Sequence, residues 1–169
     1  MSIDPKNERY DFFWKTMERC DWAFEGDDDK VLTPVITYLA EQGDEAIFRF
    51  DDLMSELLYH LDTKVLAEQY KNVSGFTSGD GFLYSRCVAL INGPGYYEKA
   101  EKGKQKNIWD LEFESLLYVP QKAWVSKYGE TGEEYPHIPR FLLKQEAMKK
   151  DGTLSAHADK DTPGMCWYK

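Results

Sequence analysis

Apolar residues recur at steps of three and four along most of the chain, and this spacing constrains the fold more than any other feature of the sequence. Because an α-helix turns once in about 3.6 residues, residues at this spacing line one helix face and can be buried against a neighbour. The successive stripes are Tyr10, Phe13, Trp14, Met17 and Phe24; Val31, Leu32, Val35, Ile36 and Leu39; Ile47, Phe50, Met54, Leu57, Leu58 and Leu61; Val65, Leu66 and Tyr70; Phe82, Leu83, Cys87, Leu90 and Ile91; Trp109, Phe113, Leu116, Leu117, Trp124 and Tyr128; and Phe141, Leu142, Leu143 and Met148. No stretch shows the sustained two-residue alternation of a half-buried strand. We therefore predict an all-α, single-domain helical bundle of about seven helices with little or no sheet.

Capping and turn residues predict where these helices begin and end. Asp4-Pro5 has the form of an N-cap followed by proline at the first helical position, so the first helix is expected to begin there and to end at the acidic residues 25–29. Gly43 and Gly93-Pro94-Gly95 are typical of helix ends. Asp62-Thr63 is expected to cap the helix that follows it.

Two prolines and one glycine-rich loop add local detail. Pro34 requires either that its helix begins at Thr33 or that the helix is kinked. Pro120 is expected to bend or split the helix around it. In the loop before the next stripe, Ser78 or Asp80 would cap the following helix.

The end of the chain is polar before it becomes helical again. Residues 129–137 are predicted to form a polar surface loop, after which Pro139 opens a last helix that ends at Gly152. We therefore expect one helical domain over residues 1–152. The tail, residues 153–169, lacks periodicity but ends in apolar residues, so it either docks on the domain, which is the prediction, or contacts a partner.

The charge balance limits the partners. The chain has 169 residues, with 21 Lys and Arg against 30 Asp and Glu, a formal net charge of −9. Nucleic acids and anionic membrane surfaces are therefore poor partners, whereas a basic protein fits. The three cysteines, Cys20, Cys87 and Cys166, form no CxxC pair, and we expect a reduced, cytoplasmic protein without a signal peptide or a membrane span.

The sequence contains no recognisable catalytic, cofactor or metal-binding motif. His60, His137 and His157 lie in separate segments without the spacing of metal ligands. Asp27, Asp28 and Asp29 lack the glycine and the terminal glutamate of a calcium loop. We expect these three carboxylates to lie in a solvated loop near the positive end of the next helix, where a partner could also contact them.

Arg86 is the charged residue that most needs an explanation. It shares a face with the apolar stripe of its own helix, and a buried arginine without a partner is costly. A carboxylate from another helix, such as Asp52, Glu98 or Glu114, could pair with it in an internal salt bridge. The other interpretation is a polar pocket near Asp80 and Arg86 that binds an anionic ligand.

Five segments carry a pattern that is known from one bacterial family. They are Phe13-Trp14; Phe48, Phe50, Leu53 and Leu57; Gly79 to Leu90, which has the sequence GDGFLYSRCVAL; Tyr97-Glu98-Lys99-Ala100; and Phe113 to Val119. Over about residues 10–128 the chain resembles the domain of unknown function 4240 family. Ser85 replaces the usual aromatic residue, Val88 replaces the usual tryptophan, and Asn72-Val73-Ser74-Gly75 replaces the usual Asn-Gly-Gly run, as in a divergent member.

The resemblance implies an all-helical bacterial domain and brings no assigned activity. A small acidic protein without a catalytic motif has the profile of a non-catalytic binding protein, and we expect an immunity-type inhibitor that neutralises a basic toxin domain by binding it. The alternative is a small-ligand-binding or enzymatic domain with its pocket near Asp80 and Arg86. The candidate ligand- or partner-binding residues are Asp80, Arg86, Glu98, Asp27, Asp28 and Asp29.

Overall fold

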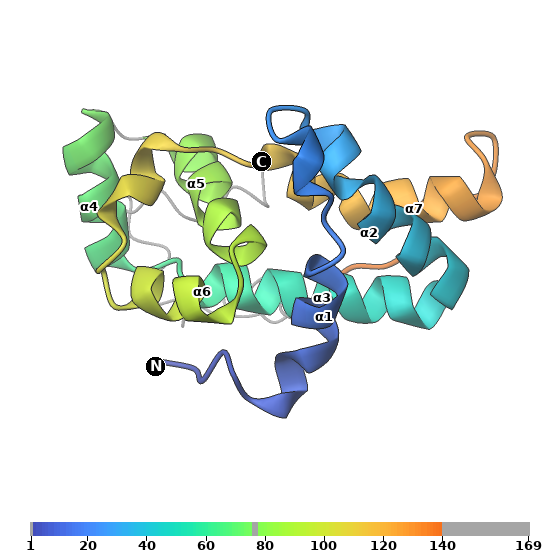
Figure 1. Ribbon diagram of the computed structural model, residues 1–169, viewed down its shortest axis with the longest axis horizontal. Helices are drawn as coiled ribbons and strands as arrows, with labels where there is room; N and C mark the ends of the chain where they lie inside the picture. Colours follow the sequence, from blue (N-terminus) through green and yellow to red (C-terminus); the bar gives the residue numbers. More distant parts are fainter. Residues whose placement is uncertain (1, 76–77, 140–169) are drawn as a thin grey trace, which may run out of the picture.

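The described part of the chain, residues 2–75 and 78–139 of a computed structural model, consists of helices joined by turns and irregular segments and contains no strand (Figure 1). Seven α-helices and four short 3₁₀ helices follow one another in this part. They are η1 (Glu8–Tyr10), α1 (Asp11–Met17), η2 (Trp22–Phe24), α2 (Asp28–Gln42), α3 (Asp44–His60), α4 (Lys64–Ser74), α5 (Gly79–Ile91), α6 (Pro94–Glu101), η3 (Lys106–Asp110), η4 (Glu114–Tyr118) and α7 (Val119–Tyr128). The predicted all-α, single-domain fold is confirmed.

The long helix α3 runs across the molecule and connects its two ends (Figure 1). At one end α2 and α7 pack against each other and against α3. At the other end α4 and α5 pack against η3, and α5 also contacts α3 and α6. The short helix α1 contacts both α2 and α3.

Aromatic residues hold α1 and α6 to α3. Phe13 stacks on Phe50 with ring centroids 5.0 Å apart, and both side chains are fully buried. The Tyr97 hydroxyl donates a hydrogen bond of 2.7 Å to the carbonyl of Leu57. These contacts join segments that are far apart in the sequence. They therefore determine how the helices pack together, whereas the local sequence determines that the helices form.

The beginning of the chain differs from the prediction. The first helix begins at η1 and α1, not at Pro5, because the Asp4 carboxylate accepts the backbone N–H of Lys6 in a turn and the Asn7 side chain caps η1. The helix also ends at Met17, so Phe24 is not part of its stripe.

Most of the other predicted helix ends agree with the structure. Gly43, with a φ of +99°, ends α2, and the Thr63 side chain caps α4. Helix α2 begins at Asp28, not at Thr33, so that Pro34 lies inside it. Pro120 lies in the first turn of α7, where a helix needs no N–H donor, and it separates α7 from η4.

The last predicted helix, from Pro139 to Gly152, and the tail of residues 153–169 involve residues outside the described part, as does the domain limit at residue 152. Among the described helices, none combines the length and the apolar composition that crossing a bilayer requires.

Candidate functional site

Arg86 is buried inside the helical core. Its side chain is 0% exposed, and Nη1 donates a hydrogen bond of 2.8 Å to the carbonyl of Leu58. The Nε group donates to the carbonyl of Phe82 at 3.4 Å, and the guanidinium carbon lies 4.6 Å from the centroid of the Phe82 ring. The carboxylate of Asp62, also buried, lies 3.8 Å from Nη1. Arg86 therefore takes part in an internal salt bridge between α5 and the α3–α4 junction.

The acidic partner of Arg86 is not one of the residues named from the sequence. Asp62 occupies that position, whereas Glu98 pairs with Lys6 and Lys102 on the surface. Asp80 is exposed in the first turn of α5, so the structure does not bring its side chain to the buried head of Arg86.

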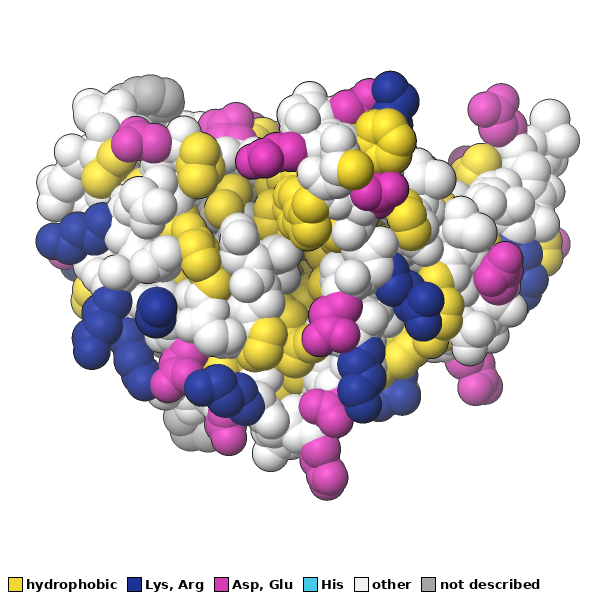
Figure 2. Space-filling view, in the orientation of Figure 1, with side chains coloured by type: hydrophobic (Ala, Val, Ile, Leu, Met, Phe, Trp, Pro, Cys, Tyr) yellow, Lys and Arg dark blue, Asp and Glu magenta, His cyan; other side chains and the backbone are white. Residues whose placement is uncertain are grey.

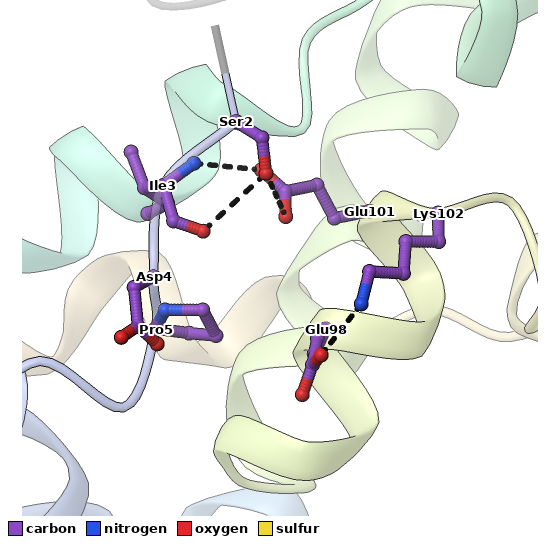
Figure 3. Close-up of a pocket in the computed structure, with 7 residues that line it drawn as sticks. All are labelled: Ser2, Ile3, Asp4, Pro5, Glu98, Glu101 and Lys102. Carbon is purple, nitrogen blue, oxygen red and sulfur yellow. Dashed lines mark hydrogen bonds and ion pairs between the residues drawn. The ribbon is translucent and has the colours of Figure 1, made fainter.

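Glu98 lines a cavity of about 320 Å³ between α6 and the N-terminal segment (Figure 3). Its carboxylate lies 2.6 Å from Lys102 Nζ and 2.7 Å from Lys6 Nζ, and these hydrogen-bonded cations lower the pKa of Glu98 to about 2. The neighbouring carboxylate of Glu101 accepts hydrogen bonds from the Ser2 hydroxyl and the Ile3 backbone N–H. Groups of this chain already engage both glutamates, and the contacts hold the N-terminal segment to α6.

The three aspartates at the start of α2 differ in their contacts. Asp27 caps the helix by accepting the N–H of Lys30, and it also pairs with that lysine side chain at 2.9 Å. Asp29 pairs with Lys122 of α7 at 2.5 Å. Asp28 makes no ion pair with a described residue, and partial burial, followed by the charges of Asp29 and Asp27, raises its pKa. The predicted place at the positive end of the helix is confirmed for this segment.

Beside these aspartates, two large aromatic side chains point toward solvent. Trp22 is 46% exposed and Phe24 is 45% exposed. The Asp21 side chain caps η2 by accepting the N–H of Ala23, and the Asp21 backbone N–H donates to the carbonyl of Val31 in α2. These bonds hold the two rings on a short helix that α2 supports.

We call Trp22, Phe24, Glu25, Asp27, Asp28 and Asp29 the η2 surface. The aspartates were predicted from the sequence as candidate partner-binding residues, whereas Trp22 was not, and Phe24 was predicted to lie in an apolar helix stripe. Phe24 follows Met17 by seven residues, a spacing that fits one face of a continuous helix, so the spacing gave no signal that the helix ends at Met17.

Next to the η2 surface lies a hollow of about 200 Å³, which we call the central hollow. It is lined by Trp14, Met17, Glu18, Trp22, Ile91, Asn92, Gly93 and Pro94. It therefore lies between α1 and the junction of α5 with α6. Figure 2 shows hydrophobic side chains gathered along the middle of this face, with acidic side chains next to them.

A third feature is a segment that crosses α3 after α7, residues 133–139, which we call the strap. The Tyr135 hydroxyl donates to the Asp51 carboxylate at 2.8 Å, and His137 Nε2 lies 2.9 Å from a carboxylate oxygen of Asp52. The His137 ring stacks on Phe48 with a centroid distance of 4.6 Å. Only a polar loop was predictable here, because each of these contacts joins residues more than eighty positions apart.

The strap also buries an ionisable group. Asp51 is 6% exposed, and burial raises its pKa to about 6 even though the hydrogen bond from Tyr135 acts in the opposite direction. A further cavity of about 470 Å³ lies between α7, the loop that follows it and the start of the strap, with Trp124, Glu130 and Glu134 among its lining residues. None of the three cavities is lined by Asp80 or Arg86. Within residues 2–75 and 78–139, no three His, Cys, Asp or Glu side chains are grouped as metal ligands would be.

Comparison with known proteins gives a family and no activity. No curated protein and no solved structure matches the chain. A family model described as a protein of unknown function (DUF4240) matches residues 9–126, which include every helix from α1 to α6 and most of α7. This range agrees with the resemblance found in the sequence. The chain therefore belongs to the DUF4240 family.

Proposed function

We propose that this protein is a non-catalytic binding protein, an immunity-type inhibitor that neutralises a basic toxin domain by binding it through the η2 surface. The observation that carries the proposal is the exposure of Trp22 and Phe24 on a short, capped helix beside an acidic segment. Tryptophan and other large aromatic side chains contribute a large share of the binding free energy in protein interfaces. In the free protein the apolar surface of these two rings is in contact with water, which is unfavourable, and a bound partner would bury it.

The ordered backbone beneath the two rings supports the proposal. Because the Asp21 side chain caps η2 and its backbone N–H is bonded to α2, the backbone that carries the two rings is already ordered before a partner binds. An interface whose aromatic side chains stand on an ordered helix therefore retains more of the free energy of burial than one formed by a mobile loop.

The charges of the η2 surface favour a basic partner. Glu25 and Asp28 form no ion pair with a described residue, and the like charges of Asp27 and Asp29 lie close to Asp28. A cationic partner would reduce this repulsion and would be attracted from a distance, which raises the rate of association. The buried free thiols of Cys20 and Cys87 are consistent with the cytoplasmic location that we propose.

The test uses the gene next to the one that encodes this protein. It is expressed in a heterologous bacterial host, alone and with this chain, and growth and complex formation are measured. We expect the neighbour to be toxic, the chain to restore growth, and the double variant Trp22→Ala, Phe24→Ala to fold normally but fail to restore it.

The matched control is Val65→Ala. Val65 is 65% exposed on α4, at the end of the molecule opposite α7 (Figure 1), and its removal should leave rescue unchanged. A harmless neighbour that forms no complex would refute the proposed function. Rescue by the double variant at the wild-type level would show that the η2 surface is not the binding surface.

A further inference from the structure

We infer that the central hollow receives one arginine side chain of the basic partner, stacked on Trp22 and paired with Glu18. The inference rests on the proposed function, because it identifies the group that the partner inserts beside the η2 surface. It follows from the size of the hollow, its lining residues and the charges around it.

The volume of the hollow suits a single side chain. At about 200 Å³ it is smaller than the roughly 300 Å³ at which pockets for drug-sized ligands begin. A side chain that projects from a protein loop can enter such a space without rearrangement of the helices on either side. The hollow is therefore an anchor point within a wider interface.

The lining selects an arginine among side chains. Met17, Ile91 and Pro94 provide apolar contact for a methylene stem, and the half-exposed ring of Trp22 provides a face for a planar cation. Glu18 is the only charged residue in the lining, and it makes no ion pair with a described residue. No lysine or arginine of the described chain lines the hollow, so its own charge is negative.

Hydrogen-bond acceptors are also present at the rim. The side-chain N–H of Asn92 donates to the carbonyl of Val88 at 2.8 Å, which leaves the side-chain oxygen of Asn92 to accept from a ligand. A guanidinium group carries five N–H donors and no acceptor, so a carboxylate and an amide oxygen match its needs. A neutral apolar side chain would leave both groups without a partner.

The chain itself pairs arginine with aromatic rings at several places. The guanidinium carbon of Arg19 lies 3.7 Å from the centroid of the Tyr38 ring, and that of Arg49 lies 4.8 Å from the centroid of the Phe12 ring. Among the described residues, no cation is stacked on Trp22 in this way; its ring neighbour is Phe113 at 6.4 Å. Tryptophan gives the strongest attraction for a cation of the aromatic residues, so its free face is a suitable position for one.

The test needs neither the toxin nor a growth assay. The full chain is labelled with 5-fluorotryptophan, which gives one fluorine NMR signal for each of its five tryptophans, and the Trp22 signal is assigned with Trp22→Phe. The protein is titrated at constant ionic strength with a capped pentapeptide that carries one arginine between glycines. The same peptide with citrulline, which has the shape of arginine without its charge, and a peptide with leucine serve as probes of charge and of apolar burial.

We expect a saturable shift of the Trp22 signal with the arginine peptide and binding of the citrulline peptide that is about fivefold weaker, as the loss of one partly exposed ion pair predicts. Glu18→Gln should reduce arginine binding to the citrulline level. Glu45→Gln removes an exposed glutamate of α3 outside the hollow and should change nothing.

Equal binding of the arginine and citrulline peptides, stronger binding of the leucine peptide, or the absence of a saturable shift at Trp22 would each overturn the inference. These outcomes can be separated from failure of the proposed function. A charge-dependent titration supports the arginine site even when the neighbouring gene proves harmless. A negative titration overturns the site even when growth is rescued.

Discussion

At the scale of single residues, two buried charged groups, Arg86 and Asp51, are compensated to different degrees. Arg86 donates to two backbone carbonyls and lies beside a carboxylate, so its charge is stabilised inside the core. Asp51 accepts one hydrogen bond within the described part of the chain, from Tyr135, and burial raises its pKa from the usual 3.8 to about 6. The ionised form of Asp51 is therefore a source of instability at neutral pH.

This difference gives a prediction for pH dependence. Because the folded state binds the Asp51 proton more tightly than the unfolded state does, the contribution of this group to stability is fully present below about pH 4 and is lost as the pH rises to about 6. The shift corresponds to about 3 kcal/mol. Asp51→Asn keeps the shape of the side chain and removes the charge. We expect this variant to be more stable than the wild type at pH 7 and equally stable at pH 4.

The measurement is the free energy of unfolding in urea at several pH values, compared between the wild type and Asp51→Asn. The difference between the two chains matters, because other carboxylates such as Glu98, whose pKa is lowered, also change stability as the pH falls. A difference that does not depend on pH would contradict the buried, ionisable position of Asp51.

At the scale of elements, the ends of the helices depend on a few backbone conformations. Gly43 ends α2 with a φ of +99°, a value that residues with a Cβ rarely adopt. Gly95 lies in the first turn of α6 without a positive φ, and a Cβ added there would meet nothing within 4 Å. The two glycines therefore form a matched pair in which only one needs to be glycine.

We predict that Gly43→Ala destabilises the fold by about 1 kcal/mol or more, because its backbone conformation becomes strained. Gly95→Ala should stabilise the fold by about 0.5–1 kcal/mol, because it reduces the freedom of the unfolded chain and favours the helix. Thermal and urea unfolding of both variants check this. Effects of the same sign would show that the backbone at Gly43 is not the constraint that we describe.

The same scale shows how far the sequence predicts elements. The cap that Thr63 provides for α4 and the end of α2 at Gly43 were predictable from the sequence. Each depends on interactions within about four residues along the chain. The start of the first helix was not, since Asp4-Pro5 fits a helix start and a simple turn equally well. The buried carbonyl of Pro5, which accepts the indole N–H of Trp14 at 2.6 Å, shows that tertiary packing selected the turn.

At the scale of the whole molecule, the net charge of −9 is spread unevenly between paired and solvated groups. Several acidic side chains are paired, as in Arg9 with Glu56 at 2.5 Å and Lys122 with Asp29. Glu25 and Asp28 on the η2 surface have no such partner among the described residues. The acidic side chains that are available to an external partner therefore include those of the η2 surface.

A double variant, Glu25→Gln with Asp28→Asn, tests this role of the charge. We expect its stability to stay within about 0.5 kcal/mol of the wild type, because neither side chain forms an ion pair with a described residue. Its association rate with the basic partner should fall severalfold at low salt and approach that of the wild type at high salt, where screening removes the attraction. Stopped-flow association at several salt concentrations measures this. Equal rates at low salt would contradict an electrostatic role for this face.

The sequence alone determined the helical class, most helix ends and the need of Arg86 for a partner, because apolar spacing and caps act over a few residues. Only the tertiary structure decided that Asp62 is that partner, that the strap crosses α3 at Asp51 and Asp52, and that Trp22 lies beside the central hollow. These facts depend on contacts between distant segments. Many carboxylates and aromatic residues of this chain could satisfy the same local rules, and the packing of the helices selects among them.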